Sequence, residues 1–241
     1  MRIAIVSDIH GNLTALDAVV ADLRGLAPDM VLHGGDLAHG GARPAEVVDR
    51  IRELGWEGIC GNTDEMLWAL ESLQVFAAKA PDMAKLFWMI QEMRAWTCTQ
   101  LEDERIAWLK TMPVIRRQGE VAVVHASPKD LWRGPGRDAP EAELKETFGE
   151  LNARVVVYGH IHQPYVREMG EWTVANTGSV SLSCDGDARA SYALVEGTKV
   201  KIRRVEYEVE REVEAGRSAG LPHAEWVAAC LRAGRFVPPE S

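Results

Sequence analysis

The sequence predicts an α/β protein in which a parallel sheet is followed by a helical segment and then by further strands. Three observations support this class. Apolar runs of strand length alternate with amphipathic helical stretches over residues 1–60, the strand pattern disappears over residues 65–112, and short β-like runs return over residues 121–207. Because alternating strands and helices join through right-handed crossovers, the first segment predicts the parallel sheet.

The first sixty residues contain three predicted strands, with a helix after each of the first two. The helices are expected at residues 13–26 and 44–54, where apolar residues recur at helical spacing. Gly25 and Pro28 end the first helix. The strands are expected at residues 3–6, 30–32 and 56–60.

Residues 65–112 predict an all-helical insertion of about two to four helices, broken near Pro81. The segment is rich in Leu, Met, Trp and Ala and lacks strand-like alternation. We expect it to form a small helical core, a cap over an active site or an interface for a homo-oligomer. Five of the eight tryptophans lie in or beside it: Trp56, Trp68, Trp88, Trp96 and Trp108.

The second half returns to β-structure and ends in a helical tail. The pattern predicts two strands and an intervening helix at residues 121–124, 155–158 and 141–151. Four later runs alternate in polarity and are expected to be antiparallel strands of a second sheet, at residues 165–168, 172–175, 192–196 and 199–207. We interpret residues 1–241 as one domain with a C-terminal helical tail over residues 208–241, whose last helix begins near Pro222.

Composition and charge restrict the possible functions. The 241-residue chain carries 27 Lys and Arg against 36 Asp and Glu, for a net charge of −9. An acidic surface argues against a nucleic-acid partner, although a bound dication can still attract a small phosphorylated substrate. The apolar runs are too short for a secretory signal or a membrane span, and the four cysteines form no Cys-x-x-Cys clip. We therefore expect a cytoplasmic protein with reduced thiols and no membrane partner.

Six short polar motifs carry the functional information, and most of them directly follow a predicted strand. Ligand sites in open α/β sheets lie at the carboxyl ends of the strands, so we expect these motifs to meet at one edge. They are Asp8-Ile9-His10-Gly11-Asn12, Gly35-Asp36, Gly61-Asn62-Thr63-Asp64, His125-Ala126-Ser127, Gly159-His160-Ile161-His162 and Asn176-Thr177-Gly178-Ser179.

The candidate metal ligands in these motifs are Asp8, His10, Asp36, Asn62, His125, His160 and His162. Oxygen and imidazole donors without thiolates suit Mn, Fe, Zn, Ni or Co. Seven donors exceed what one catalytic ion needs, but they suffice for two ions about 3.5–4 Å apart that share a carboxylate. Taken singly, a histidine could be a solvated loop residue, Asp36 a helix cap and Asn62 a turn residue. His160 and His162 are harder to dismiss, because alternate residues of an extended segment share a face.

This ordered set of motifs resembles the calcineurin-like metallophosphoesterases, and especially their small bacterial and archaeal phosphodiesterase branch. Segments 176–179 and 185–192 are also similar to that branch, and the resemblance covers about residues 1–207. It implies a four-layer α/β/β/α sandwich of two mixed sheets with a helical insertion.

The resemblance also implies a role for each ligand. The first metal would be held by Asp8, His10, Asp36 and His162, and the second by Asp36, Asn62, His125 and His160. Asp36 would bridge the two ions, and a bridging hydroxide would attack phosphorus in line with the departing alcohol. Mn²⁺ is the ion we expect first. Asp64 would orient a ligand histidine.

Two departures from the family pattern concern the leaving group and the space in the site. Related protein phosphatases carry a histidine at the position of Thr63, where it is thought to protonate the leaving group. His39 would substitute as a catalytic residue if it lay near the mouth of the site; otherwise it is a solvated loop residue. Ala126 stands where the family often has glycine, and its methyl group would narrow the site.

The substrate determinants are weaker than the metal motifs. Asn12 opens the first helix, whose N-terminal amides could face a phosphate, and Asn62 could contact substrate as well as metal. Arg133, Arg137 and Arg189 are candidate phosphate contacts, although any one of them is more often a surface charge. His33 is expected to be structural and His223 to lie on the surface.

Together these observations predict a dinuclear-metal phosphohydrolase, a phosphodiesterase or phosphomonoesterase acting on a small phosphorylated substrate such as a nucleotide. The expected catalytic residues are Asp36, Asn62 and His39. A protein serine/threonine phosphatase is the enzyme alternative. A non-catalytic scaffold of the same fold, like the retromer subunit, is the alternative from another class, but it predicts lost ligands, whereas every expected ligand position is filled.

Overall fold

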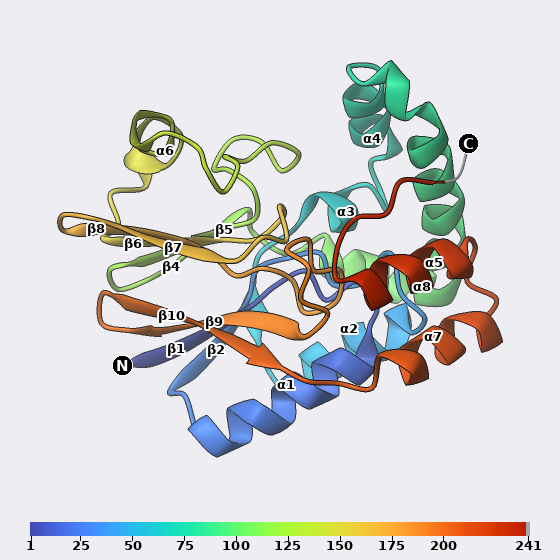
Figure 1. The fold of residues 1–241 in the computed structure, drawn as a ribbon, viewed down its shortest axis with the longest axis horizontal. Helices are drawn as coiled ribbons and strands as arrows, with labels where there is room; N and C mark the ends of the chain where they lie inside the picture. Colours follow the sequence, from blue (N-terminus) through green and yellow to red (C-terminus); the bar gives the residue numbers. More distant parts are fainter. Residues whose placement is uncertain (240–241) are drawn as a thin grey trace.

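Two five-stranded sheets form the centre of the protein in the computed structural model, which describes residues 1–239 (Figure 1). The first sheet has the order β10-β9-β1-β2-β3 and the second has the order β4-β5-β6-β8-β7. The first sheet consists of β1 (Arg2–Val6), β2 (Met30–His33), β3 (Glu57–Gly58), β9 (Ala190–Glu196) and β10 (Lys199–Val205). The second consists of β4 (Ile115–Gln118), β5 (Val121–Val124), β6 (Val155–Tyr158), β7 (Tyr165–Met169) and β8 (Trp172–Asn176).

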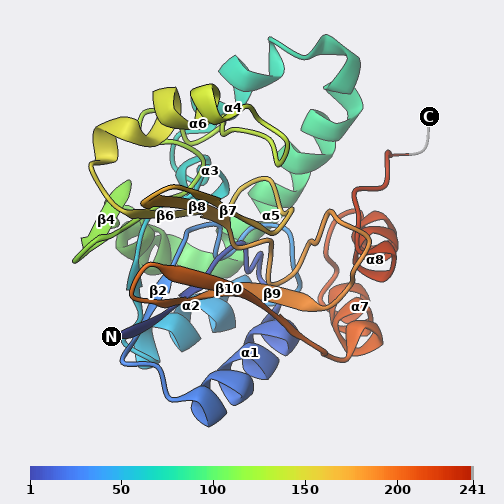
Figure 2. The same ribbon diagram turned by 60° about the vertical axis from the view of Figure 1, so that its left-hand side comes forward.

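Helices cover the outer faces of both sheets, which confirms the predicted four-layer α/β/β/α class. Helices α1 (Leu13–Leu26) and α2 (Pro44–Glu53) cover the first sheet, and α6 (Glu141–Phe148) covers the second (Figures 1 and 2). A separate apolar layer lies between the sheets and includes Ile5, Leu32, Val123, Val157 and Val195. Burial of this layer fixes how the sheets stack, and therefore how their strand ends meet.

The last four strands were predicted to belong to the second sheet, and this is wrong for two of them. Strands β7 and β8 belong to the second sheet, but β9 and β10 join the first, where β9 lies antiparallel to β1. The physical reason is that β9 is buried on both faces: Ala193 and Val195 face the second sheet, while Tyr192 and Leu194 pack with the helix layer. Such a strand fits beside the central β1. Strand β4 was not expected, because its Ile-Arg-Arg-Gln sequence lacks an apolar run.

Helices fill most of residues 62–109: α3 (Asn62–Glu65), α4 (Leu70–Ala77), a 3₁₀ turn (Pro81–Met83) and α5 (Ala84–Leu109). The break near Pro81 is where the sequence predicted it. The long helix α5 packs against α2 at the side of the sandwich, and α4 stands above the strand ends (Figure 1).

The C-terminal segment folds into two helices, α7 (Val209–Ser218) and α8 (Ala224–Ala233), which pack against each other. Residues 240–241 of the predicted tail lie outside the described residues. Among residues 1–239, no helix is both long enough and apolar enough to cross a membrane. All four cysteines are free thiols.

Candidate metal centre

The carboxyl ends of β1, β2, β5 and β6 meet at one edge of the sandwich and bring the polar motifs together. Backbone hydrogen bonds join the loops that follow these strands. The amide of Asp8 donates to Gly35 O (3.1 Å), and the amide of Gly159 donates to His125 O (2.9 Å). The second bond joins the segments that follow β5 and β6, which carry the expected metal ligands His125 and His160.

Backbone strain is concentrated at this edge. Five of the candidate ligands adopt left-handed backbone angles with φ between 50° and 67°: Asp8, His10, Asp36, His160 and His162. Non-glycine residues rarely adopt this conformation, and such residues cluster at functional sites. Two motif glycines allow the crowding, because a Cβ on Gly61 would collide with the Asp36 carboxylate and a Cβ on Gly159 with that of Asp8.

A first group of donor atoms is formed by Asp8, His10 and His162. The Nε2 atoms of the two histidines are 3.2 Å apart, and His162 Nε2 lies 3.1 Å from Asp8 Oδ1. Their ligand atoms lie within 4.8 Å of one another, close enough for one ion.

A second group is formed by Asn62, His125 and His160. The Oδ1 atom of Asn62 lies 2.8 Å from His125 Nε2 and 3.0 Å from His160 Nδ1. Asp36 lies between the two groups, because its Oδ2 is 3.7 Å from His10 Nε2 and 3.5 Å from His125 Nε2. Asp8 is also close to Asp36 and His125, so both carboxylates face the middle of the site.

Each of the four histidine rings is oriented by a backbone carbonyl on its outer side. A carbonyl only accepts, so the outer nitrogen must carry the proton, and in a neutral ring the inner nitrogen presents a lone pair. Facing lone pairs at about 3 Å repel unless a cation or a proton lies between them, and carbonyl-oriented histidines are typical of metal sites. The pairs are His10 Nδ1 with His39 O (2.7 Å), His125 Nδ1 with Gly34 O (2.9 Å), His162 Nδ1 with Leu182 O (2.6 Å) and His160 Nε2 with Trp132 O (3.2 Å).

The carboxylates hold protons on two of the histidines. Burial alone would raise the pKa of Asp36, but neighbouring His125 and His10 lower it well below its usual range. Burial would lower the pKa of His125, but Asp36 and Asp8 raise it to about 9. In the same way, Asp8 raises the pKa of His162 well above its usual value against the effect of burial.

The other two histidines favour the neutral form. Burial lowers the pKa of His10, and it lowers the pKa of His160 to about 4. Neutral imidazole is the form that binds a metal. The site therefore contains carboxylates, neutral imidazoles and imidazoles whose protons a metal can displace.

Asp64 is buried beside the ligands, but it does not orient a histidine as expected. Its carboxylate accepts backbone amide hydrogen bonds from Asp36 (2.8 Å), Leu37 (2.9 Å) and Gly61 (3.0 Å). Burial and the nearby Asp36 carboxylate raise the pKa of Asp64 to about 6. Asp64 thus fixes the backbone at Asp36 and at the start of α3, which carries Asn62.

Two residues expected to reach substrate or leaving group are placed elsewhere. Asn12 is fully buried as the N-cap of α1; its Oδ1 accepts from Ala15 N (2.8 Å) and its Nδ2 donates to Ser181 Oγ (3.1 Å). The oxygen and the nitrogen of its side chain are thus both used inside the fold. His39 is buried rather than at the mouth of the site, and burial beside His10 lowers the pKa of its ring to about 3, which makes it a poor proton donor at neutral pH.

The candidate arginines lie outside the cluster of ligands. Arg189 is exposed and pairs with Asp187 (2.6 Å). Arg137 is exposed beside β7, away from the ligands. Arg133 is also exposed, and it follows Trp132, whose carbonyl contacts the His160 ring.

The remaining two histidines do not join the metal centre. His33 is buried and packs against Gly58, as expected for a structural residue. His223 precedes α8 and pairs with Glu92. The sequence did not indicate Trp132 or Leu182, because a backbone carbonyl that orients a histidine has no residue-type signature.

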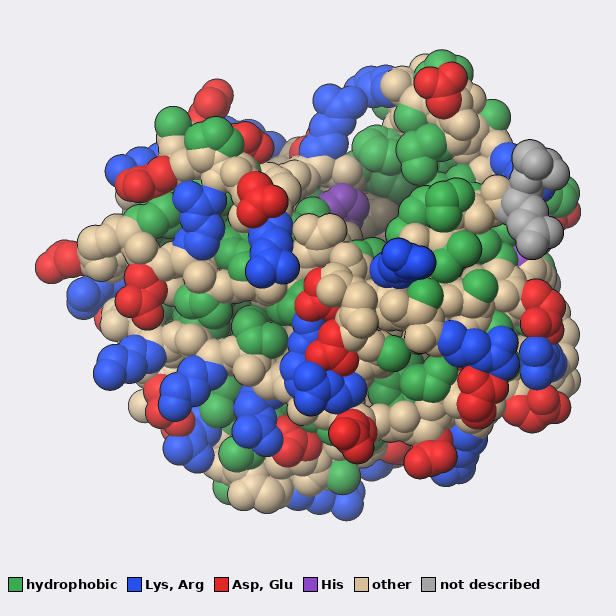
Figure 3. All heavy atoms as spheres, in the orientation of Figure 1, with side chains coloured by type: hydrophobic (Ala, Val, Ile, Leu, Met, Phe, Trp, Pro, Cys, Tyr) green, Lys and Arg blue, Asp and Glu red, His purple; other side chains and the backbone are tan. Residues whose placement is uncertain are grey.

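The site opens to a hollow on one face of the molecule. Figure 3 shows a histidine side chain in this hollow, with hydrophobic side chains gathered on the side of the helical insertion and basic side chains reaching over its rim. Trp132, whose carbonyl accepts from the His160 ring, packs against Phe76 of α4 with ring centroids 5.1 Å apart. The ligands are thus accessible from solvent on the side that the helical insertion borders.

Imidazoles and carboxylates gathered at the strand ends of this sandwich are typical of a metal-dependent phosphoester hydrolase. Comparison with known families agrees, because the calcineurin-like phosphoesterase superfamily domain matches residues 1–199. The chain belongs to the calcineurin-like phosphoesterase superfamily and is a metal-dependent phosphoester hydrolase.

Individual relatives extend this similarity over nearly the whole chain. The protein MJ0912 of Methanocaldococcus jannaschii is 30% identical and aligns with 97% of this chain and 98% of its own length. The crystal structure of a metallophosphoesterase from Sphaerobacter thermophilus is 28% identical, with a TM-score of 0.78 over 97% of this chain and 100% of that one. A symmetrical bis(5′-nucleosyl)-tetraphosphatase of Methylococcus capsulatus is 29% identical over 60% of this chain and 50% of its own length.

Proposed function

We propose that this protein is a dinuclear-metal phosphohydrolase that cleaves a phosphodiester or phosphomonoester in a small phosphorylated molecule such as a nucleotide. The observation that supports this best is the orientation of the four histidine rings. Each ring donates its outer N–H to a carbonyl. This directs three inner nitrogens toward the buried carboxylates of Asp8 and Asp36, and that of His160 toward Asn62 Oδ1.

The donors divide into two sets that share Asp36. One ion would be held by Asp8, His10, Asp36 and His162, and the other by Asp36, Asn62, His125 and His160. Divalent ions supply an activated water at neutral pH and offset the charge that builds on the phosphoryl oxygens. The mixed oxygen and nitrogen donors suit Mn²⁺ first, with Fe, Zn, Ni or Co as alternatives.

A small substrate is favoured by the shape and charge of the site. Trp132 contacts the candidate ligand His160 through its carbonyl and packs against Phe76, and Arg133 is exposed on the same loop as Trp132. An aromatic wall beside a metal centre suits a nucleoside attached to the scissile phosphate. The similarity to a symmetrical bis(5′-nucleosyl)-tetraphosphatase supports the same substrate class.

Hydrolysis of nitrophenyl phosphate esters tests the reaction class. The purified protein with Mn²⁺ is expected to hydrolyse p-nitrophenyl phosphate or bis(p-nitrophenyl) phosphate, and EDTA is expected to abolish the activity until Mn²⁺ is restored. The ratio of the two rates distinguishes a monoesterase from a diesterase. Absence of turnover of both esters with every divalent ion would contradict the proposal and favour a scaffold.

A further inference from the structure

The C-terminal helices contain a carboxylate that the metal centre does not use directly. Glu212 lies on α7 and is only 2% exposed. Its Oε2 accepts hydrogen bonds from Thr14 Oγ1 (2.7 Å) and from the guanidinium of Arg43. Its Oε1 has no hydrogen-bond partner among the described residues. Burying a charge with incomplete partners is costly, so a glutamate here needs a reason other than stability.

The two partners of Glu212 lie just beyond the two loops that surround His10. Thr14 is in the first turn of α1, immediately after the loop that carries Asp8 and His10. Arg43 precedes α2 and ends the loop that carries Asp36 and His39. One carboxylate therefore holds the far ends of both loops together.

These loops contact each other directly at His10. His10 Nδ1 donates to His39 O (2.7 Å), and Arg43 N donates to Gly11 O (3.0 Å). Gly41 packs so closely on the His10 carbonyl that a Cβ would not fit. Movement of Arg43 would be transmitted to the carbonyl that orients the His10 ring.

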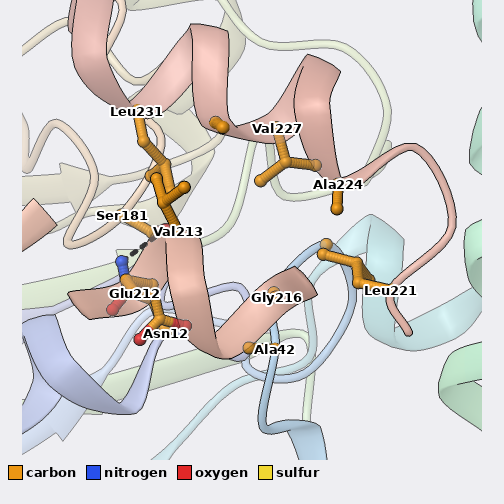
Figure 4. Close-up of a pocket in the computed structure, with 13 residues that line it drawn as sticks. Asn12, Ala42, Ser181, Glu212, Val213, Gly216, Leu221, Ala224, Val227 and Leu231 are labelled. Atoms are coloured by element: carbon orange, nitrogen blue, oxygen red, sulfur yellow. Dashed lines mark hydrogen bonds between the residues drawn. The ribbon is translucent and has the colours of Figure 1, made fainter. Parts of the chain in front are cut away.

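The same helices also support the loop that orients the other histidine of this group. His162 Nδ1 donates to the carbonyl of Leu182 (2.6 Å), and the Leu182 side chain packs with Val213, Leu221, Val227 and Leu231 of the C-terminal segment. Figure 4 shows Val213, Leu221, Val227 and Leu231, together with Ser181, around a cavity of about 10 Å³. Glu212 and Asn12 also line this cavity. A cavity of this size has room for one water molecule, so the packing is close.

We infer that Glu212 is a positioning residue for the first metal. Through Thr14 and Arg43, Glu212 sets the orientation of His10. Helices α7 and α8 together support the Asp8–His10–His162 group. This inference rests on the proposed dinuclear function. Within residues 1–239, the hydrogen bonds of the Glu212 side chain go to Thr14 and Arg43, whereas the carbonyls that orient the histidines of the second group belong to Gly34 and Trp132. Loss of Glu212 should therefore weaken one metal position and spare the other.

The test measures binding of Mn²⁺ to metal-free full-length protein by calorimetry and by electron paramagnetic resonance. Glu212→Ala is expected to lower the affinity of one ion by about 10- to 100-fold and leave the other within about twofold. The spectrum of a coupled Mn²⁺ pair should be replaced by that of a single ion at limiting Mn²⁺. Glu210→Ala is the matched control, because Glu210 lies on the same helix, is 68% exposed and pairs with Arg232 on the surface.

Two further variants keep the inference testable if Glu212→Ala fails to fold. Thr14→Val removes the hydrogen bond to Glu212 and the one that the Thr14 hydroxyl accepts from Arg43, while keeping the side-chain volume, and should give a smaller selective loss of about three- to tenfold. Glu212→Gln retains an acceptor and should lie between wild type and alanine. Unchanged affinity for both ions in folded Glu212→Ala or Thr14→Val would overturn the inference and leave the proposed function intact. Fewer than two ions in wild type would overturn the proposed function itself.

Discussion

The two halves of the metal centre are held by different helical segments. The Asp8–His10–His162 half is supported from behind by α7 and α8, through Glu212 and the packing of Leu182. The Asn62–His125–His160 half is bordered by the helical insertion. The sandwich core brings both sets of ligands to one edge, but it leaves their final orientation to segments outside the two sheets.

The contacts of the second half show how the insertion acts. Arg94 of α5 donates to the carbonyls of Met66 and Leu67 (both 2.6 Å), which directly follow α3 at the end where helix carbonyls lack intrahelical partners. Helix α3 begins at Asn62. The insertion thus fixes the helix that carries a metal ligand, whereas the tail fixes the loops that carry the other group.

The helical additions do more than complete the hydrophobic core. Each one reaches a different group of candidate ligands through a small number of polar contacts. A change in the tail and a change in the insertion should therefore have separable effects on the two ions, while a change at Asp36 should affect both.

The largest expected effect comes from the residue that the two halves share. Asp36→Asn should reduce the hydrolysis rate by about 10²- to 10³-fold, because a neutral amide cannot compensate two cations. His39→Ala is the matched control: it alters a buried side chain of the same loop and should cost less. Steady-state kinetics at saturating Mn²⁺ measure both. Comparable losses would remove the bridging assignment.

The pH dependence of metal affinity should be large in both halves, since each contains a histidine that holds a proton. His125 has its pKa raised to about 9 and His162 has its pKa raised well above the usual value, so binding must displace these protons. Affinity for Mn²⁺ should rise by up to about tenfold per pH unit for each displaced proton and level off for His125 above about pH 9. Calorimetry in buffers of different ionisation enthalpy measures the proton release.

Protonation of His125 opposes metal binding, but it stabilises the folded state of the metal-free protein. Protonated His125 stabilises the folded state at pH values below its unfolded pKa of 6.5, and this contribution is lost as the pH rises through about 9. Metal-free protein should therefore lose thermal stability over the pH range in which it gains metal affinity. Affinity and melting temperature that both stay flat from pH 6 to 9 would contradict the assignment of the proton to His125.

A smaller effect should separate the insertion from the tail. Arg94→Met removes the two hydrogen bonds that hold the end of α3, and should weaken the ion bound by Asn62 by about tenfold while sparing the other. Arg105→Met is the control, because Arg105 lies on the same helix and pairs with Asp49 away from the site. Equal weakening of both ions in Arg94→Met would show that the insertion does not act on one half alone.

The sequence allowed the gathering of the candidate ligands to be predicted, because they follow strands and parallel strands bring such positions to one edge. It did not allow the sheet of β9 to be predicted, since alternation defines the faces of a strand but not its neighbours. The capping role of Asn12 could not be separated from phosphate binding, because both use the same residue type at the same position. Glu212 looks like a surface residue in a polar helix, and only the tertiary structure shows that it is buried.

A crystal structure of the protein soaked with Mn²⁺, with anomalous data, tests the central claim most directly. Two anomalous peaks are expected, one among Asp8, His10, Asp36 and His162 and one among Asp36, Asn62, His125 and His160. A single anomalous peak in a crystal saturated with Mn²⁺, or peaks away from Asp36, would contradict a dinuclear centre at these strand ends.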